Sequence, residues 1–136
     1  MASGGPFIHR LRVRYHECDQ QGRVFNAHYF AYYDIALTEL WREAFGSYQE
    51  MTDGGHDLVV AEAKATFRGF AKFDDEIDVV LTVNRLGNTS MTTDVQIRRD
   101  HEVLVDGQIV HVWVDAGTLE KRPIPHQARE TLSRFS

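Results

Sequence analysis

The sequence of 136 residues has a single cysteine, Cys18, and no apolar run of the roughly 18 residues that a membrane-spanning helix needs. One cysteine cannot form a disulfide within the chain, and a chain without disulfides fits the reducing cytosol. We therefore expect a cytoplasmic protein with no membrane partner.

Basic residues are outnumbered by acidic ones. The 15 Lys and Arg against 20 Asp and Glu give a net charge of -5, which argues against a protein that binds the phosphate backbone of nucleic acids. The seven histidines show no metal-ligand spacing and Cys18 has no second thiol, so we expect no metal and no cofactor. A glycine-rich phosphate loop and a serine-nucleophile motif are missing as well.

The chain does contain one long helical pattern. Apolar residues from His28 to Phe45 recur every three or four positions over more than half of the circumference, which predicts a buried helix that stops at Gly46. Before it, alternation over residues 7–15 predicts a half-buried strand with Tyr15 on its apolar side.

Strand patterns fill most of the rest, over 58–73, 76–87, 89–99 and 103–116. The segments GNTS and RDHE are predicted hairpin turns, MTDGGHD is a loop by composition, and HQARETLSRF is a short amphipathic helix. Asp106–Gly107 is either a third hairpin turn or a bulge within one strand.

This order of elements predicts one domain over residues 1–136, of the α+β class, with a curved antiparallel sheet of about five strands wrapped around one long central helix. Such a sheet leaves two strand edges exposed, and proteins usually pair or cover them. We therefore expect a homodimer or a homotetramer.

The polar loop before the helix contains the residues with the clearest chemical potential. Asp19 lies seven residues before Asn26, near the predicted helix start, where backbone N–H groups without partners can polarise a carbonyl. A nearby carboxylate can attack that carbonyl or activate a water beside it. Gly22 permits a tight turn or the close approach of a ligand. The plainer interpretation is that Asp19 and Asn26 are loop and capping residues.

The segment VRYHECDQQGRVFNAHYFAYYDIALTEL resembles the signature of hotdog-fold acyl-CoA thioesterases of the 4-hydroxybenzoyl-CoA thioesterase type. The matching positions are Glu17, Asp19, Gly22, Val24, Asn26 and Tyr29, followed by an acidic residue at Asp34. The segments FAKFDDEIDVVLTV and RPIP extend the resemblance over most of the chain.

The resemblance implies a hotdog fold and hydrolysis of an acyl-CoA to a free carboxylic acid and CoA, with sites between protomers. It implies that Asp19 is the catalytic carboxylate, as nucleophile or general base, and that the backbone N–H around Asn26 polarises the thioester carbonyl. The best-known members have Tyr or His where this chain has Asn26. The resemblance also makes 103–115 one strand, with Gly107 as a kink.

The substrate contacts that we expect are Gly22, Phe25 and Tyr29. The last two belong to an aromatic group that either lines an aryl pocket or forms plain core, together with Phe30, Tyr32 and Tyr33. For the phosphates of CoA, the resemblance points to basic residues near the turn 87–89, where only Arg85 lies close. Further candidates are Arg68, Arg98, Arg99, Lys121 and Arg122.

Several alternatives stay open. A thioesterase acting on an acyl carrier protein would favour a basic docking face, which the net charge disfavours. A hotdog dehydratase or hydratase would place a histidine near the helix start, and His28 keeps that alternative open. A non-catalytic acyl-CoA-binding module would have no use for Asp19. In another branch of the fold, Asp34 or Glu39 on the helix would replace Asp19 as the carboxylate.

Overall fold

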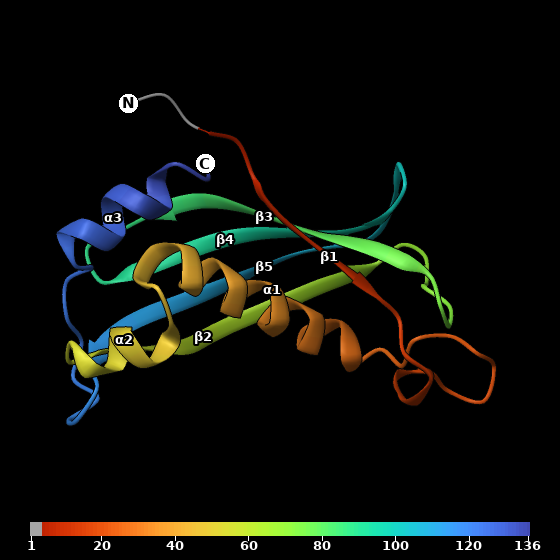
Figure 1. Cartoon of the computed structure of the whole chain (residues 1–136), viewed down its shortest axis with the longest axis horizontal. Helices are drawn as coiled ribbons and strands as arrows, with labels where there is room; N and C mark the ends of the chain where they lie inside the picture. The colour runs from red at the N-terminus through yellow and green to blue at the C-terminus, as the bar shows by residue number, and fades with distance from the viewer. Residues whose placement is uncertain (1–3) are drawn as a thin grey trace.

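A computed structural model describes residues 4–136; the first three residues of the predicted domain lie outside this range. A five-stranded antiparallel sheet has one long helix against one face (Figure 1). The strands are β1 (Phe7–Arg12), β2 (His56–Phe67), β3 (Glu76–Leu86), β4 (Ser90–Arg99) and β5 (Glu102–Asp115), in the order β1-β3-β4-β5-β2. The helices are α1 (His28–Phe45), α2 (Tyr48–Asp53) and α3 (His126–Ser133), with a 3-10 turn, η1 (Tyr15–Glu17). The predicted α+β architecture is confirmed.

Helix α1 is the centre of the core. Its spacing of apolar residues buries Tyr29, Tyr32, Tyr33, Ala36, Leu37, Leu40, Trp41 and Ala44 on one broad face. The helix ends where predicted, because Gly46 adopts the left-handed φ of 87° and its N–H donates to the Arg42 carbonyl at 2.8 Å.

Strand β5 runs unbroken through Asp106 and Gly107, so this dipeptide is neither a turn nor a bulge. The single strand over 103–115 that the family resemblance implies is confirmed, and the hairpin turn that the residues alone left open is wrong. A Cβ at Gly107 would collide with the Lys64 carbonyl oxygen and the Tyr33 hydroxyl. Glycine thus leaves room for Tyr33 to cross the strand and donate a 2.9 Å hydrogen bond to that carbonyl.

Three predicted boundaries are wrong. Strand β2 ends at Phe67, not at residue 73, and β1 ends at Arg12, so Tyr15 lies in η1 with 80% of its surface exposed. The predicted loop at 51–57 instead contains the last turn of α2 and the start of β2. Ser47 caps α2 by accepting a hydrogen bond from the Glu50 N–H at 3.0 Å.

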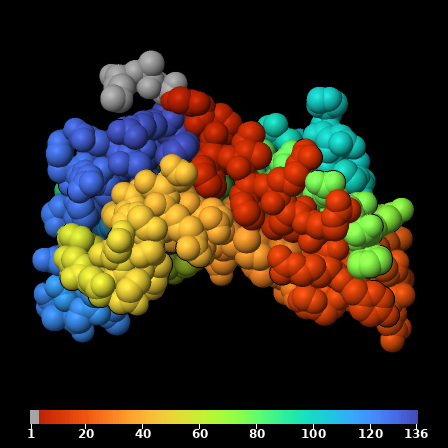
Figure 2. All heavy atoms as spheres, viewed as in Figure 1, coloured from red at the N-terminus to blue at the C-terminus, as the bar shows by residue number. Residues whose placement is uncertain are grey.

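The two ends of the sheet carry different structures. In the view of Figure 2, β1 crosses the middle of the molecule toward the right-hand end, where the loop after it lies, whereas α2 and α3 lie at the left-hand end. The loop that contains Asp19 is therefore far from both short helices and lies at the N-terminal end of α1 (Figure 1).

Candidate active site

The loop around Asp19 folds back on itself as a small hairpin. The Asp19 N–H donates to the Arg23 carbonyl at 2.7 Å, and Cys18 forms an antiparallel bridge with Val24. Gly22 makes the turn possible by adopting a φ of 76°, which a residue with a side chain rarely does. The backbone of the loop is thus fixed on both sides of Asp19.

The Asp19 carboxylate is held by one oxygen and open at the other. Its Oδ1 accepts hydrogen bonds from the N–H groups of Gln21 at 2.8 Å and Arg23 at 3.3 Å. Its Oδ2 forms no hydrogen bond or ion pair with residues 4–136. The side chain is exposed at a cavity of about 380 Å³, lined by Tyr15, Cys18, Asp19, Gln20, Gly22 and Phe73. An oriented carboxylate with a free oxygen is suited to act as a base or nucleophile.

The N-terminus of α1 follows this hairpin directly in the chain. Helix α1 begins at His28, and Asn26 lies in the turn before Ala27, which caps the helix with helical dihedral angles. The N–H groups of Asn26 and Ala27 have no acceptor in the part of the chain that the structure describes. Asn26 is not one of the residues that line the Asp19 cavity. The segment 23–25 connects the two groups.

Glu17 ties the hairpin to α1. Only 5% of its surface is exposed, and its Oε1 accepts from the Tyr32 hydroxyl at 2.9 Å and from the Arg14 N–H at 2.8 Å. Burial, and next the hydrogen bond to this carboxylate, raise the pKa of Tyr32 well above its usual value. The Glu17 carbonyl also accepts the Phe25 N–H at 3.0 Å. Sequence reasoning matched Glu17 to a motif but did not find this function, because no local pattern pairs it with Tyr32.

The predicted substrate contacts lie in two environments. Gly22 lines the cavity, and Phe25 is 55% exposed beside His28. Tyr29 is 1% exposed, and its hydroxyl accepts the Ala71 N–H at 2.9 Å, so its side chain belongs to the core. The same is true of Tyr32 and Tyr33 in the predicted aryl pocket, whereas Phe30 is 37% exposed.

The remaining charged candidates lie elsewhere. Arg85 is exposed at the opposite end of β3 from Asp75; the ten residue steps from one to the other span roughly 30 Å in a strand. Asp34 is on the exposed face of α1, where partial burial raises the pKa of its carboxyl. Glu39 pairs with Arg42 at 3.3 Å.

The other basic candidates for CoA differ in their partners. Arg68, Arg99 and Arg122 form ion pairs with carboxylates. Arg98 donates to the Gln96 side chain, and Lys121 takes part in a backbone bridge to Val114.

Within residues 4–136, no three His, Cys, Asp or Glu side chains gather as a metal site would require. Over the same residues, no helix is long and apolar enough to cross a membrane.

Comparison of this chain with known proteins identifies the family to which it belongs. A putative esterase of Aquifex aeolicus is 28% identical over 127 residues, which are 93% of this chain and 98% of that protein. YbgC of Escherichia coli, named an acyl-CoA thioester hydrolase, is 26% identical over 116 residues, covering 85% of this chain and 87% of its own.

The crystal structure of Slr0204, a 1,4-dihydroxy-2-naphthoyl-CoA thioesterase from Synechocystis, superimposes with a TM-score of 0.83 at 22% identity, covering 94% of this chain and 96% of that one. At that identity the likeness shows the shared hotdog fold. The sequence model of the thioesterase superfamily matches residues 21–106, more than half of the chain, including Gly22 and Asn26. The chain therefore belongs to the thioesterase superfamily, whose reaction is thioester hydrolysis.

Proposed function

We propose that this protein hydrolyses acyl-CoA thioesters to a carboxylic acid and CoA, with Asp19 as the catalytic carboxylate. The observation that carries the proposal is the Asp19 side chain, which lines an open cavity and whose Oδ1 is fixed by two backbone N–H groups, while Oδ2 has no hydrogen-bond partner within residues 4–136. The acyl-CoA substrates in the names of the two thioesterases above support the choice of substrate class.

The second half of the proposed site is the N-terminus of α1, with its free backbone N–H groups. The N–H groups of Asn26 and Ala27 lie at the positive end of the helix dipole and, within the described residues, have no acceptor of their own. Donors of this kind stabilise the oxyanion that forms when a thioester carbonyl is attacked. Because the donors belong to the main chain, Asn26 serves as well as any other residue that carries an N–H.

Two routes lead to the same products. As a general base, Asp19 takes a proton from water, the resulting hydroxide adds to the carbonyl carbon, and the C–S bond breaks to release the CoA thiolate, which regains the proton. As a nucleophile, Asp19 displaces the thiolate to form a mixed anhydride, which water then hydrolyses. In heavy-oxygen water, one turnover labels Asp19 only by the second route.

Thiol release from a panel of short-chain, long-chain and aromatic acyl-CoAs tests the activity directly. Release from at least one member, dependent on enzyme concentration, is expected, and the relative rates rank the acyl groups. If no member releases thiol while CoA still raises the melting temperature, the protein is a binder or a dehydratase and the proposal is wrong.

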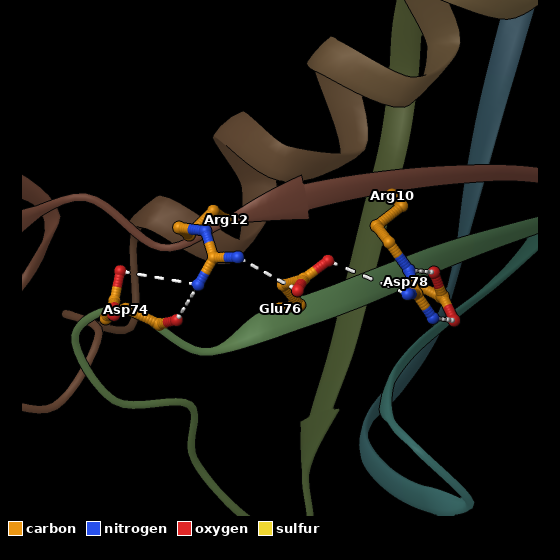
Figure 3. A network of polar contacts seen from close by, with 5 residues as sticks. All are labelled: Arg10, Arg12, Asp74, Glu76 and Asp78. Atoms are coloured by element: carbon orange, nitrogen blue, oxygen red, sulfur yellow. Dashed lines mark hydrogen bonds and ion pairs between the residues drawn. The ribbon is translucent and has the colours of Figure 1, made fainter.

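We further propose that the protein forms a homodimer through the free edge of β2. This edge is mostly exposed, with Val59 39% and Val60 54% exposed, and its ion pair of Glu62 with Lys64 at 3.1 Å alternates with alanines. The opposite edge, β1, is lined by ion pairs of Arg10 and Arg12 with β3 and the turn before it (Figure 3). Charged edges resist pairing, whereas an apolar edge favours it.

Two matched variants test the dimer. Val60→Asp on β2 and Ile8→Asp on β1 introduce the same charge at side chains of nearly equal exposure, 54% and 55%. Light scattering is expected to show a dimer for wild type and Ile8→Asp and a monomer for Val60→Asp. A dimer that survives only in Val60→Asp would place the interface at β1 instead.

A further inference from the structure

The hairpin of the candidate active site rests against the segment 68–75, which joins β2 to β3. Two backbone hydrogen bonds hold the two parts together. The Val24 N–H donates to the Ala71 carbonyl at 2.9 Å, and the Phe73 N–H donates to the Gly22 carbonyl at 3.1 Å. The segment therefore lies beside the returning half of the hairpin in the way that a third strand would.

Arg23 carries this contact to the carboxylate. It forms an isolated antiparallel bridge with Lys72, and its guanidinium carbon lies 4.1 Å from the centroid of the Phe70 ring, where a cation is attracted to the ring face. The N–H of the same residue is one of the two donors to Asp19 Oδ1, at 3.3 Å. A shift of the segment would therefore move a group that orients Asp19.

The segment is itself fixed at Ala71 by a side chain of α1. Ala71 is 0% exposed, so its N–H cannot reach water, and it donates to the Tyr29 hydroxyl oxygen at 2.9 Å. Ala71 thus bonds α1 through its N–H and the hairpin, at Val24, through its carbonyl. Tyr29 is 1% exposed and its ring lies 5.6 Å from that of Phe67, so its hydroxyl has a fixed position in the core.

The end of the segment toward β3 is anchored in another way. Asp75 forms an ion pair with Arg99 at 2.7 Å, and its carbonyl accepts the Val13 N–H at 2.9 Å. Ala71 lies four residues before this anchor. The part of the segment that contacts the hairpin therefore depends on the hydrogen bond to Tyr29.

We propose that Tyr29 is a positioning residue for Asp19. Its hydroxyl sets the place of Ala71, Ala71 sets the place of Val24, and the hairpin then presents the carboxylate to substrate. The inference rests on the proposed function and gives Tyr29, which the sequence placed among the substrate contacts, an indirect role. Losing the hydroxyl leaves the buried Ala71 N–H without its acceptor, which favours a shift of the segment toward water.

Tyr29→Phe tests the proposal because it keeps the ring in the core and removes only the hydroxyl. For the best acyl-CoA, kcat is expected to fall about tenfold with KM unchanged, since a small displacement of a catalytic group slows the chemical step. Tyr33→Phe is the matched control, because the Tyr33 hydroxyl is also buried in α1 and bonds a backbone group, the Lys64 carbonyl, at 2.9 Å. It should keep wild-type kcat, and equal losses in the two variants would overturn the proposal.

Hydrogen exchange measured by NMR follows the same connection without turnover. In Tyr29→Phe, the N–H groups of Ala71, Val24 and Gln21 are expected to exchange faster, the last because it donates to Asp19 Oδ1. In Tyr33→Phe all three should exchange as in wild type. Faster exchange at Ala71 alone would show a purely local bond and overturn the proposal. Exchange that spreads to Gln21 supports the connection even if hydrolysis itself is not found.

An amide-to-ester replacement at Ala71 removes the other partner of the same hydrogen bond. It should lower kcat about as much as Tyr29→Phe does, and the two changes together should cost no more than either alone. Wild-type kcat in the ester variant, or a second tenfold loss on combining the changes, would show that Tyr29 does not act through Ala71.

Discussion

The two ends of the sheet both place polar groups among aromatic side chains, but they treat those groups differently. At the Asp19 end, Glu17 is buried with two hydrogen bonds to its Oε1, and Asp19 is exposed with one oxygen fixed. At the end near α2 and α3, His111 and Trp113 are buried, and His111 Nδ1 and Trp113 Nε1 have no partner among the described residues.

This difference suggests that the Asp19 end of the sheet contributes to catalysis and the His111 end to the stability of the fold. The proposed catalytic role of Asp19 needs access to substrate, which its exposure at a cavity allows, and a fixed orientation, which its two hydrogen bonds supply. Buried polar atoms without partners supply neither and cost free energy of folding, about 1–3 kcal/mol each. Changes near Asp19 should therefore alter turnover, and changes near His111 should alter the free energy of unfolding.

The largest effect on turnover short of removing Asp19 is expected from the Asn26 N–H. Asn26→Pro removes this donor and should lower kcat by about 10² to 10³, as the loss of one oxyanion donor does. Asn26→Ala keeps the N–H and should stay near wild type. Thiol release measures both. An amide-to-ester replacement at the same bond removes the donor without the proline ring, should the proline variant misfold.

His111 should make the protein sensitive to acid. Burial lowers the pKa of His111 to about 4 in the folded chain, against about 6.5 when unfolded. The unfolded state therefore binds a proton that the folded state does not, and the free energy of unfolding falls as the pH drops from about 6.5 to 4, by about 3 kcal/mol in total.

Urea unfolding at pH 7 and pH 4.5 measures this loss. In His111→Leu the part of the acid sensitivity that comes from this side chain should disappear, while kcat stays at the wild-type value. His101→Gln, at an exposed turn, is the control and should retain the full sensitivity. An unchanged pH dependence in His111→Leu would show that His111 is not its source.

A smaller effect is expected from the bond between Tyr32 and Glu17. Tyr32→Phe removes one donor from a buried carboxylate, which should cost about 2 kcal/mol of stability and lower kcat several-fold with KM unchanged. Tyr33→Phe is the matched control on the same helix, because its hydroxyl bonds the Lys64 carbonyl, away from the Asp19 hairpin. It should lose comparable stability and keep wild-type kcat.

Glu17→Gln sharpens this comparison. One oxygen of Glu17 accepts both hydrogen bonds, so the amide oxygen of glutamine can replace it and kcat should stay near wild type. If Tyr32→Phe and Tyr33→Phe lower kcat equally, Glu17 has no specific effect on Asp19 and the hydrogen bond is purely structural.

Sequence patterns predicted the architecture well because they follow from periodicity. The buried face of α1, its end at Gly46 and the two hairpins after β3 and β4 all depend on local spacing. The start of α2 was missed although Ser47 and Glu50 have the spacing of a capping box, since the glycines after them favoured a loop. Tyr15 continued the strand alternation, but β1 ends at Arg12 and Tyr15 is the first residue of η1.

The candidate site was predictable only where it is local. Asp19 and Gly22 lie three positions apart and line one cavity, so their association follows from the sequence; Asn26, seven positions after Asp19, does not line it. The contacts of Glu17 with Tyr32 and of Arg23 with Phe70 join residues 15 and 47 positions apart, and they depend on how α1 and the segment after β2 pack against the hairpin. Such pairs follow from tertiary packing and have no signal in one sequence.

The most direct test of the account is thiol release from the best acyl-CoA by wild type and Asp19→Asn, with melting temperatures measured on the same samples. Asparagine preserves the size of the side chain and can accept the hydrogen bonds of Gln21 and Arg23, but it is neither base nor nucleophile. We expect kcat to fall by at least about 10², with the melting temperature and CoA affinity close to wild type. Wild-type turnover by Asp19→Asn would contradict the account and direct attention to Asp34 or Glu39.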